Sequence, residues 1–436
     1  MSKFQIIIIA IFVIGLVVAF LMFAGVIPGM NNNTNVLKEK LYVWGPFPEK
    51  EIKAVLNELG REDKLESDFI IYTAKNPETY ESELINAMAS GQSPDIFFIN
   101  QDMLAGFKDK IEGLPFANFS ERDFMDTFFD SAVLFTDKNE GKILAFPYFI
   151  DPLVLYWNKD LFSSVGLSQP PRTWIDFQSM APLLTKLNAG AVFQAGAGMG
   201  EFANIKNAED IISMMILQTG NSVIDYEKNS VVWNTKEGKL ETPLESSLRF
   251  FTGFANPKQP IYSWNRSLNQ SDVMFTGGLL AMYFGRASEL ESIKARNPHL
   301  NFDVIAPPQI SSDSTENARF RATYADIYAL AVSKSSTKKQ SSFLAIYSLI
   351  SGDINKPLAD SIGLVPPRRD LLAEKVSDPF MNIFYQSAIM AKSWIKPDKE
   401  KVSGLFKTMI ESITSGKSTV SESASSATKQ LQLLLK

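Results

Sequence analysis

The stretch AFPYFIDPLVLYW, residues 145–157, decides the fold of this chain. It is apolar except for one carboxylate, Asp151, and it contains two prolines, Pro147 and Pro152. Proline is disfavoured inside a helix, so the segment is predicted to be extended. Its length is typical of a strand that passes from one lobe of a protein to another.

Short apolar runs alternate with helical patterns on the amino-terminal side of this stretch. The predicted strands are residues 41–45 (LYVWG), 69–72 (FIIY) and 94–100 (PDIFFIN), and the predicted helices are residues 48–59 and 78–90. This alternation predicts an α/β fold with a parallel sheet that is covered by helices. Ligands of such sheets bind beyond the carboxyl ends of the strands.

Helices prevail on the carboxyl-terminal side. Thr173 and Asp176 have the spacing of a helix cap, and a mainly helical stretch follows to about Asn256. Residues 302–307 and 322–332 are predicted to be return strands, after which helices continue to the end of the chain.

Residues 1–30 are predicted to be an amino-terminal membrane anchor. Residues 4–27 are apolar except for Gln5, and such a run forms about 36 Å of helix, enough to cross a hydrocarbon core of ~30 Å. The run exceeds the apolar region of a cleavable signal peptide, which remains the alternative. Residues 31–40 then read as a short polar spacer.

The composition excludes several kinds of chemistry. The 436 residues include no cysteine, which excludes disulfides, thiol catalysis and cysteine-ligated metals. The single histidine, His299, cannot supply a histidine triad or a multi-histidine metal site. A net charge of -5 with scattered basic residues gives no case for nucleic acid. We therefore expect no cofactor, no metal and no catalytic residue.

A longer string, FPYFIDPLVLYWNKDLFSSVGLSQPPRTWIDF at residues 146–177, resembles the crossover region of family 1 extracellular solute-binding proteins, the maltose-binding-protein-like group. Further similar segments follow the order of that family: LYVWG at 41–45, INAMASGQSPDIFFIN at 85–100, VMFTGGLLAMYFG at 273–285, IAPPQ at 305–309 and FKTMIESITSGKSTVSES at 406–423. The resemblance covers nearly everything from Leu41 onward. The family's usual tether, a lipid-modified cysteine or a cleaved periplasmic signal, has no match here.

The resemblance implies a two-lobed periplasmic-binding-protein-like fold of type II over residues 41–436, with hinge crossover strands. The first lobe is expected to hold residues 41–148 and 302–325, and the second residues 152–300 and part of 326–436. It further implies a protein on the extracytoplasmic side of the cell membrane that delivers a mono- or oligosaccharide to the permease of an ABC importer.

Sugar recognition needs aromatic faces for the C–H side of a ring and carboxylates or amides for the hydroxyls. Trp44 ends the first strand, while Trp264 and Trp394 lie in polar segments where an exposed tryptophan is expected to have a use. Each is a candidate stacking platform, with a place in the core as the alternative. Trp157, Trp174 and Trp233 are predicted to be core residues.

Polar candidates follow the predicted strands. Asp151 lies where the resembled family often has its binding acid, and the alternative is a hinge residue that caps local N–H groups. Asn100 and Asp102 follow the third strand, where Asp102 could instead cap a helix.

Two further pairs complete the set. Tyr324 and Asp326 stand where the family has a cleft-lining loop. Gly285 would permit close approach of a ligand, and Arg286 would bond either a polar group of the ligand or a surface acid.

Three other functions compete with import. A glycan hydrolase would need paired carboxylates, but no two acids stand at a recognisable spacing. A tethered sensor would look the same in sequence as an importer component. A phenolate metal site would require Tyr324 and Tyr328 to point into the cleft together.

Overall fold

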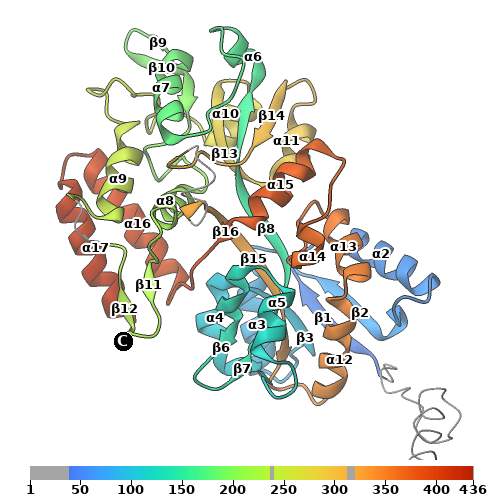
Figure 1. The fold of residues 1–436 in the computed structure, drawn as a ribbon. Coiled ribbons are helices and arrows are strands. Elements are labelled where there is room, and N and C mark those ends of the chain that lie inside the picture. The colour runs from blue at the N-terminus through green and yellow to red at the C-terminus, as the bar shows by residue number, and fades with distance from the viewer. Residues whose placement is uncertain (1–38, 236–239, 312–319, 436) are drawn as a thin grey trace, which may run out of the picture.

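Strand β8 (Phe146–Asn158) crosses the molecule and belongs to both of its lobes (Figure 1). The computed structural model describes residues 39–235, 240–311 and 320–435. The first half of β8 pairs antiparallel with β15 (Thr323–Ser333). The second half pairs antiparallel with β13 (Leu280–Arg286) and β14 (Phe302–Ile305). The predicted crossing strand is therefore confirmed.

The first lobe contains the parallel sheet that the amino-terminal pattern predicts. Strand β1 (Leu41–Gly45) pairs parallel with β2 (Ile70–Ala74) and with β3 (Ile96–Asn100). Helices α2 (Glu49–Arg61) and α3 (Tyr80–Ala89) connect the three strands. Strand β3 also pairs antiparallel with β15, so one sheet in the order β2-β1-β3-β15-β8-β13-β10-β9 continues from lobe to lobe.

Shorter elements complete the first lobe: α4 (Gln101–Phe107), β4 (Ile111–Glu112), β5 (Leu114–Pro115), α5 (Glu121–Thr127), β6 (Thr136–Asp137), β7 (Lys142–Ile143), α12 (Lys339–Leu349), α13 (Gly352–Ser361) and α14 (Arg369–Leu372). An aromatic cluster holds this lobe to the crossing strands. Phe47 packs edge-on against Phe98, Phe149 and Tyr328, with 4.9 to 5.0 Å between ring centres. Such pairs add about 0.5–1.5 kcal/mol each beyond their buried area.

The second lobe is built on the other half of β8. Strand β10 (Ala191–Ala197) pairs parallel with β13, and β9 (Lys186–Asn188) forms the edge of the sheet. The remaining elements are α6 (Lys159–Ser163), α7 (Trp174–Leu184), α8 (Ala208–Gln218), β11 (Ile224–Asp225), β12 (Ser230–Val231), α9 (Pro243–Gly253), α10 (Ser271–Thr276) and α11 (Leu290–Arg296). The predicted cap of α7 is confirmed, because Thr173 Oγ1 accepts a hydrogen bond from Asp176 N–H.

The carboxyl-terminal segment returns to the second lobe. Helix α15 (Pro379–Ile389) leads to β16 (Ala391–Lys392), which pairs parallel with the beginning of β15. Helices α16 (Lys399–Thr414) and α17 (Val420–Leu434) then pack beside α9 (Figure 1).

The expected division between the lobes differs from the structure in one segment. Residues 302–325 were expected in the first lobe, but Phe302–Ile305 pairs with the second half of β8 and lies in the second lobe. A return strand can pair with either half of a crossing strand, and the sequence pattern of β14 does not distinguish the two.

The predicted anchor at residues 1–30 and most of the spacer at 31–40 lie outside the described residues. Over the part of the chain that the structure describes, no helix combines the length and the apolar character needed to cross a membrane. The last residues of the spacer contact the first lobe, where Glu39 accepts a hydrogen bond from Ser341 and the Lys40 carbonyl accepts one from Lys338.

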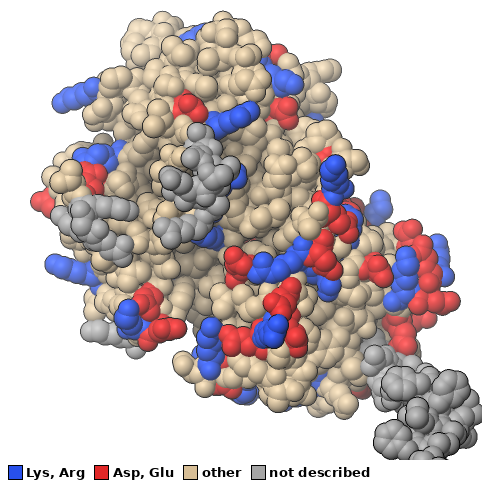
Figure 2. Space-filling view, in the orientation of Figure 1, with Lys and Arg blue, Asp and Glu red and all other residues tan. Residues whose placement is uncertain are grey.

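The surface carries charges of both signs. Figure 2 shows acidic and basic side chains intermingled around the lower lobe. Exposed pairs such as Arg249–Glu241, at 2.7 Å, are typical of the outer surface. Such pairs contribute about 0–1 kcal/mol each.

Candidate functional site

A cleft of about 740 Å³ lies between the two lobes where β8 and β15 cross. The first lobe contributes residues around the carboxyl end of β3, as the strand-end rule predicts. The second lobe contributes the beginning of α8, the end of β13 and the beginning of α16. Five of the ten predicted site residues line this cleft: Asn100, Asp102, Asp151, Arg286 and Asp326.

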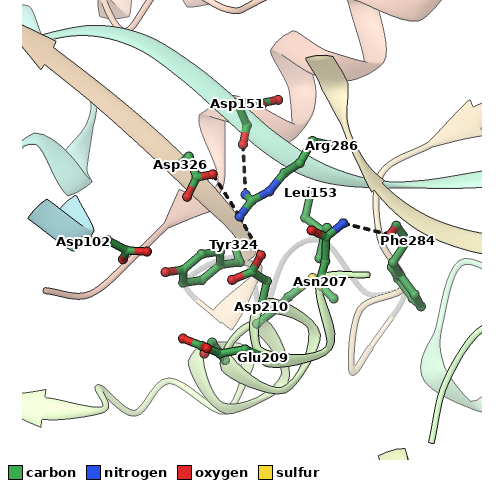
Figure 3. A network of polar contacts seen from close by, with 12 residues as sticks. Asp102, Asp151, Leu153, Asn207, Glu209, Asp210, Phe284, Arg286, Tyr324 and Asp326 are labelled. Carbon is green, nitrogen blue, oxygen red and sulfur yellow. Dashed lines mark hydrogen bonds and ion pairs between the residues drawn. The ribbon is translucent and has the colours of Figure 1, made fainter. Parts of the chain in front are cut away.

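Arg286 lies at the centre of the polar network in the cleft (Figure 3). Its Nη2 is 2.7 Å from Asp210 Oδ2 and 3.3 Å from Asp326 Oδ2. Its Nη1 donates a hydrogen bond of 3.1 Å to the carbonyl of Asp151. One guanidinium therefore connects the end of β13, the first turn of α8 and both crossing strands.

The carboxylate of Asp151 is held by a single residue. Ser288 donates two hydrogen bonds to it, from its backbone N–H at 3.0 Å and from its hydroxyl at 2.6 Å. Burial raises the pKa of Asp151 to about 6, although Arg286 and the Ser288 hydrogen bonds oppose the rise. Asp151 lines the cleft, but the backbone N–H that it accepts from belongs to Ser288, 137 residues along the chain, and not to the local hinge. Its role as a binding acid stays a prediction.

Lys396 forms a buried ion pair with one acid of each lobe. Its Nζ is 3.0 Å from Asp102 Oδ2 in the first lobe and 2.6 Å from Glu209 Oε1 in the second. Burial alone would lower the pKa of Lys396, but Tyr324, Asp102 and Glu209 hold it well above its usual value. The ammonium group therefore remains charged and joins the two sides of the cleft.

Asn100 and Asp102 have different roles at the end of β3. Asn100 caps α4, because its side chain accepts a hydrogen bond of 3.1 Å from Met103 N–H. That arrangement leaves the carboxylate of Asp102 for Lys396. The cap that we considered for Asp102 is thus provided by Asn100.

The described aromatic lining of the cleft is contributed by Tyr80, Phe98, Tyr328 and Phe202. The first three belong to the first lobe and its crossing strand. Tyr80 is fixed by its hydroxyl, which donates a hydrogen bond of 2.6 Å to the carbonyl of Phe98. Rings held in this way present a rigid apolar surface.

The three candidate tryptophans lie elsewhere. Trp264 is fully buried and donates a hydrogen bond to Asn204, and Trp394 is 2% exposed and donates one to Ser213. The expectation that these two rings are exposed is wrong, because both pack in the hydrophobic core while their N–H groups find polar partners distant in sequence. Trp44 is half-buried, with Lys75 Nζ 3.8 Å from its ring centre, and is not among the cleft-lining residues. Trp157, Trp174 and Trp233 are buried, as predicted.

Gly285 leaves room for two neighbouring tyrosine rings. A Cβ atom at this position would lie 2.6 Å from Cε1 of Tyr283 and 3.0 Å from the ring of Tyr156. The expectation that this glycine admits the ligand is not met, because the space beside it is filled by two tyrosines.

Tyr324 lies under the polar network and is fully buried. Its hydroxyl has no hydrogen-bond partner among the described residues. Burial raises the pKa of both Tyr324 and Tyr328 well above the usual value, which disfavours the phenolates that a metal site would need. In the described parts of the chain, no group of three or more histidine, cysteine, aspartate or glutamate side chains is placed to hold a metal ion.

The predictions from the sequence did not include four residues that line the cleft, Lys396, Glu209, Asp210 and Ser288, or the buried Gln101 beside it. Gln101 donates a hydrogen bond to Asp326 and accepts one from Ile327 N–H. Glu209 and Asp210 are adjacent acids directly after the asparagine and alanine that begin a helix, and this was a usable signal for both of them. Lys396 gave no local signal, because its partner Asp102 is 294 residues away.

Two α/β lobes that share crossing strands and enclose a polar cleft define the periplasmic-binding-protein fold. The chain belongs to the bacterial extracellular solute-binding protein family, whose model matches residues 70–382. It is therefore an extracytoplasmic solute-binding protein and not an enzyme.

Single curated relatives match either a short segment of this chain or a longer part at low sequence identity. The chain is 39% identical to the sn-glycerol-3-phosphate-binding periplasmic protein UgpB of Salmonella typhimurium over 77 residues, which cover 17% of this chain and 16% of that relative. It is 20% identical to a putative binding protein of Brucella abortus over 293 residues, 66% of each chain. The alignments thus cover less than two thirds of these relatives.

Solved structures share the fold over almost the whole chain. The sugar-binding protein MalE of Xanthomonas citri superposes with a TM-score of 0.70 at 18% identity, covering 91% of this chain and 97% of that one. An ABC substrate-binding protein of Listeria monocytogenes in complex with cycloalternan gives a TM-score of 0.66 at 17% identity, covering 90% and 98%.

Proposed function

We propose that this protein is tethered to the membrane, binds a carbohydrate in the cleft and delivers it to an ABC importer when the lobes close. The observation that carries this proposal is the position of the cleft. It lies at the two crossing strands, and both lobes supply its lining. A ligand there would bridge the lobes, so it would favour the closed state over the open one.

The chemistry of the lining suits a polyhydroxylated solute. Asn100, Asp102, Asp151, Arg286 and Asp326 supply amide, carboxylate and guanidinium groups. Hydrogen bonds from hydroxyls to charged groups contribute about 1.5–3 kcal/mol each. Of the lining rings, Tyr328 and Phe202 are partly exposed and offer apolar surface for the C–H face of a sugar ring.

The import role rests on family and neighbours. MalE of Xanthomonas citri is a sugar-binding protein, and the Listeria monocytogenes protein is an ABC substrate-binding protein that holds a cyclic oligosaccharide. The apolar residues 4–27 would keep the binding domain at the membrane, with a spacer that ends at the first lobe.

Thermal unfolding of the full-length protein against neutral mono- and oligosaccharides tests the proposal. A ligand at 100 times its Kd adds about 2.7 kcal/mol to the free energy of unfolding, which raises Tm visibly. Asp102→Asn, which keeps the shape of the side chain, is expected to weaken sugar binding about tenfold or more. Trp44→Phe, outside the cleft, is the matched control and should bind as the wild type does.

If no sugar of the panel raises the Tm of the wild-type protein, the carbohydrate proposal is contradicted. If one sugar does raise it, the uptake of that sugar by cells that lack the protein separates import from sensing. Loss of uptake supports delivery to an importer, whereas normal uptake with a lost transcriptional response would identify a sensor.

A further inference from the structure

The cleft carries more acid than base. Seven carboxylates but only four basic side chains line it. The basic groups are Lys206, Arg286, Lys396 and Lys399. The excess of three carboxylates sets the cleft apart from the mixed charges of the outer surface (Figure 2).

The two buried cations already have carboxylate partners. Arg286 contacts Asp210 and Asp326 (Figure 3), and Lys396 contacts Asp102 and Glu209. Each cation is thus paired with two acids, in a region where the side chains are 22% exposed or less.

The other two bases lie nearer to solvent. Lys206 is 3.0 Å from Glu289, so it too is paired within the cleft. Lys399 is exposed at the first residue of α16. Water and salt screen a charge in such a position.

An anion that entered this cleft would approach carboxylates, and each buried cation that it met would already be paired with two acids. It would have to compete with those acids for the cation, and displacing one would leave a buried carboxylate without its partner. A hydroxyl group avoids both costs, because it can donate to a carboxylate while the ion pair stays intact.

We propose that the cleft selects uncharged polyols and excludes phosphorylated and carboxylated solutes, because the carboxylates around Arg286 and Lys396 already neutralise both cations. This inference rests on the proposed function as a solute-binding cleft. It separates the ligand of this chain from sn-glycerol 3-phosphate, the ligand in the name of the relatives that share a 77-residue segment.

Calorimetric titration of the full-length wild-type protein provides the first test. The probes are inorganic phosphate, glycerol 3-phosphate and glucose 6-phosphate, with sodium chloride at equal ionic strength as the control. We expect no saturable heat of binding with any of the three anions. Saturable binding of any of them would overturn the proposal.

A gain of binding provides the second test. The double variant Asp102→Asn with Glu209→Gln removes both acids from Lys396. Burial lowers the pKa of this lysine once its carboxylate partners are gone, so the titration is run below neutral pH to keep the ammonium charged. The variant is expected to give a saturable heat with inorganic phosphate where the wild type gives none. Adding Lys396→Met should abolish the gain. A folded double variant that gains no phosphate binding would overturn the stated cause, and the wild-type titration decides the matter if the variant does not fold.

The two proposals fail in different ways. A wild-type protein that binds neither sugars nor phosphates would contradict the carbohydrate function and leave anion exclusion standing. A protein that binds a sugar phosphate more tightly than the matching sugar would keep the solute-binding role and contradict this inference.

Discussion

The two sides of the cleft differ in composition. The first lobe contributes mostly rings, prolines and aliphatic groups, with Glu81 and Asp102 as its charged members before β8. The second lobe and the carboxyl-terminal segment contribute seven charged residues: Lys206, Glu209, Asp210, Arg286, Glu289, Lys396 and Lys399. The difference teaches that most of the charged groups are assembled on one lobe, and that the other faces them with a largely apolar surface and two acids, Glu81 and Asp102. Changes on the second-lobe side should therefore cost more stability.

The largest effect is expected from Arg286→Met. The change leaves Asp210 and Asp326 buried without their cation, and removing one partner of a buried pair typically costs about 3–5 kcal/mol. Urea unfolding monitored by circular dichroism measures the loss. Arg249→Met removes an exposed pair in the same lobe and should cost less than about 1 kcal/mol. If both variants lose the same free energy of unfolding, the buried network does not stabilise the fold more than the exposed pair does.

Asp151 lies between the two sides, and its effect is visible in the pH dependence of stability. Its pKa is raised from 3.8 to about 6, so the folded state binds a proton more tightly than the unfolded state does. The stability from this group is fully present below pH 3.8 and falls between about pH 4 and 6, by up to about 3 kcal/mol. Asp151→Asn should remove that part of the pH slope while keeping an acceptor for Ser288 N–H. Parallel pH profiles of the two proteins would contradict the assignment.

Gly285→Ala tests whether the charged, second-lobe side of the cleft is also tightly packed. The added methyl would meet Tyr283 and Tyr156, and overpacking of this kind costs about 1–3 kcal/mol. Gly404→Ala in α16 is the control, because a Cβ there has no neighbour within 4 Å and helix propensity favours alanine by up to about 1 kcal/mol. A shift of Tm in the same direction for both variants would mean that packing does not decide the effect at Gly285.

The smallest effect is expected on the first-lobe side. Tyr80→Phe keeps the ring and removes the hydrogen bond to the Phe98 carbonyl, at a cost of about 1 kcal/mol. Ligand affinity should change little, since the apolar face of the ring remains. If this variant loses as much stability as Arg286→Met, the two sides of the cleft do not differ in the way that their composition indicates.

The fold could be predicted because its signals are local. The crossing strand, the strands at 41–45 and 94–100 and the cap at Thr173 all follow from composition and spacing within a few residues. The lobe that β14 joins could not be predicted, because the pairing of a return strand depends on which edge of β8 other segments of the chain occupy, and this is not a local signal.

The predicted residues that line the cleft lie at strand ends or on the crossing strands. Asn100 ends β3, Asp102 follows it and Arg286 ends β13. Asp151 and Asp326 lie inside β8 and β15, where the family resemblance indicated them. The exposure of Trp264 and Trp394 was predicted wrongly because their neighbours in sequence are polar, whereas in space both rings pack in the hydrophobic core and donate their N–H groups to Asn204 and Ser213.

The order of the strands also constrains how the chain can fold as it is made. Strand β15 lies between β3 and β8 in the sheet, yet it is synthesised after every strand of the second lobe. Until residues 323–333 are available, β3 and the first half of β8 have open edges that could pair with other chains. Strands β9 to β14 of the second lobe are made before β15, whereas helices α16 and α17, which pack beside α9, are made last. Neither lobe is therefore complete until the carboxyl-terminal segment has emerged.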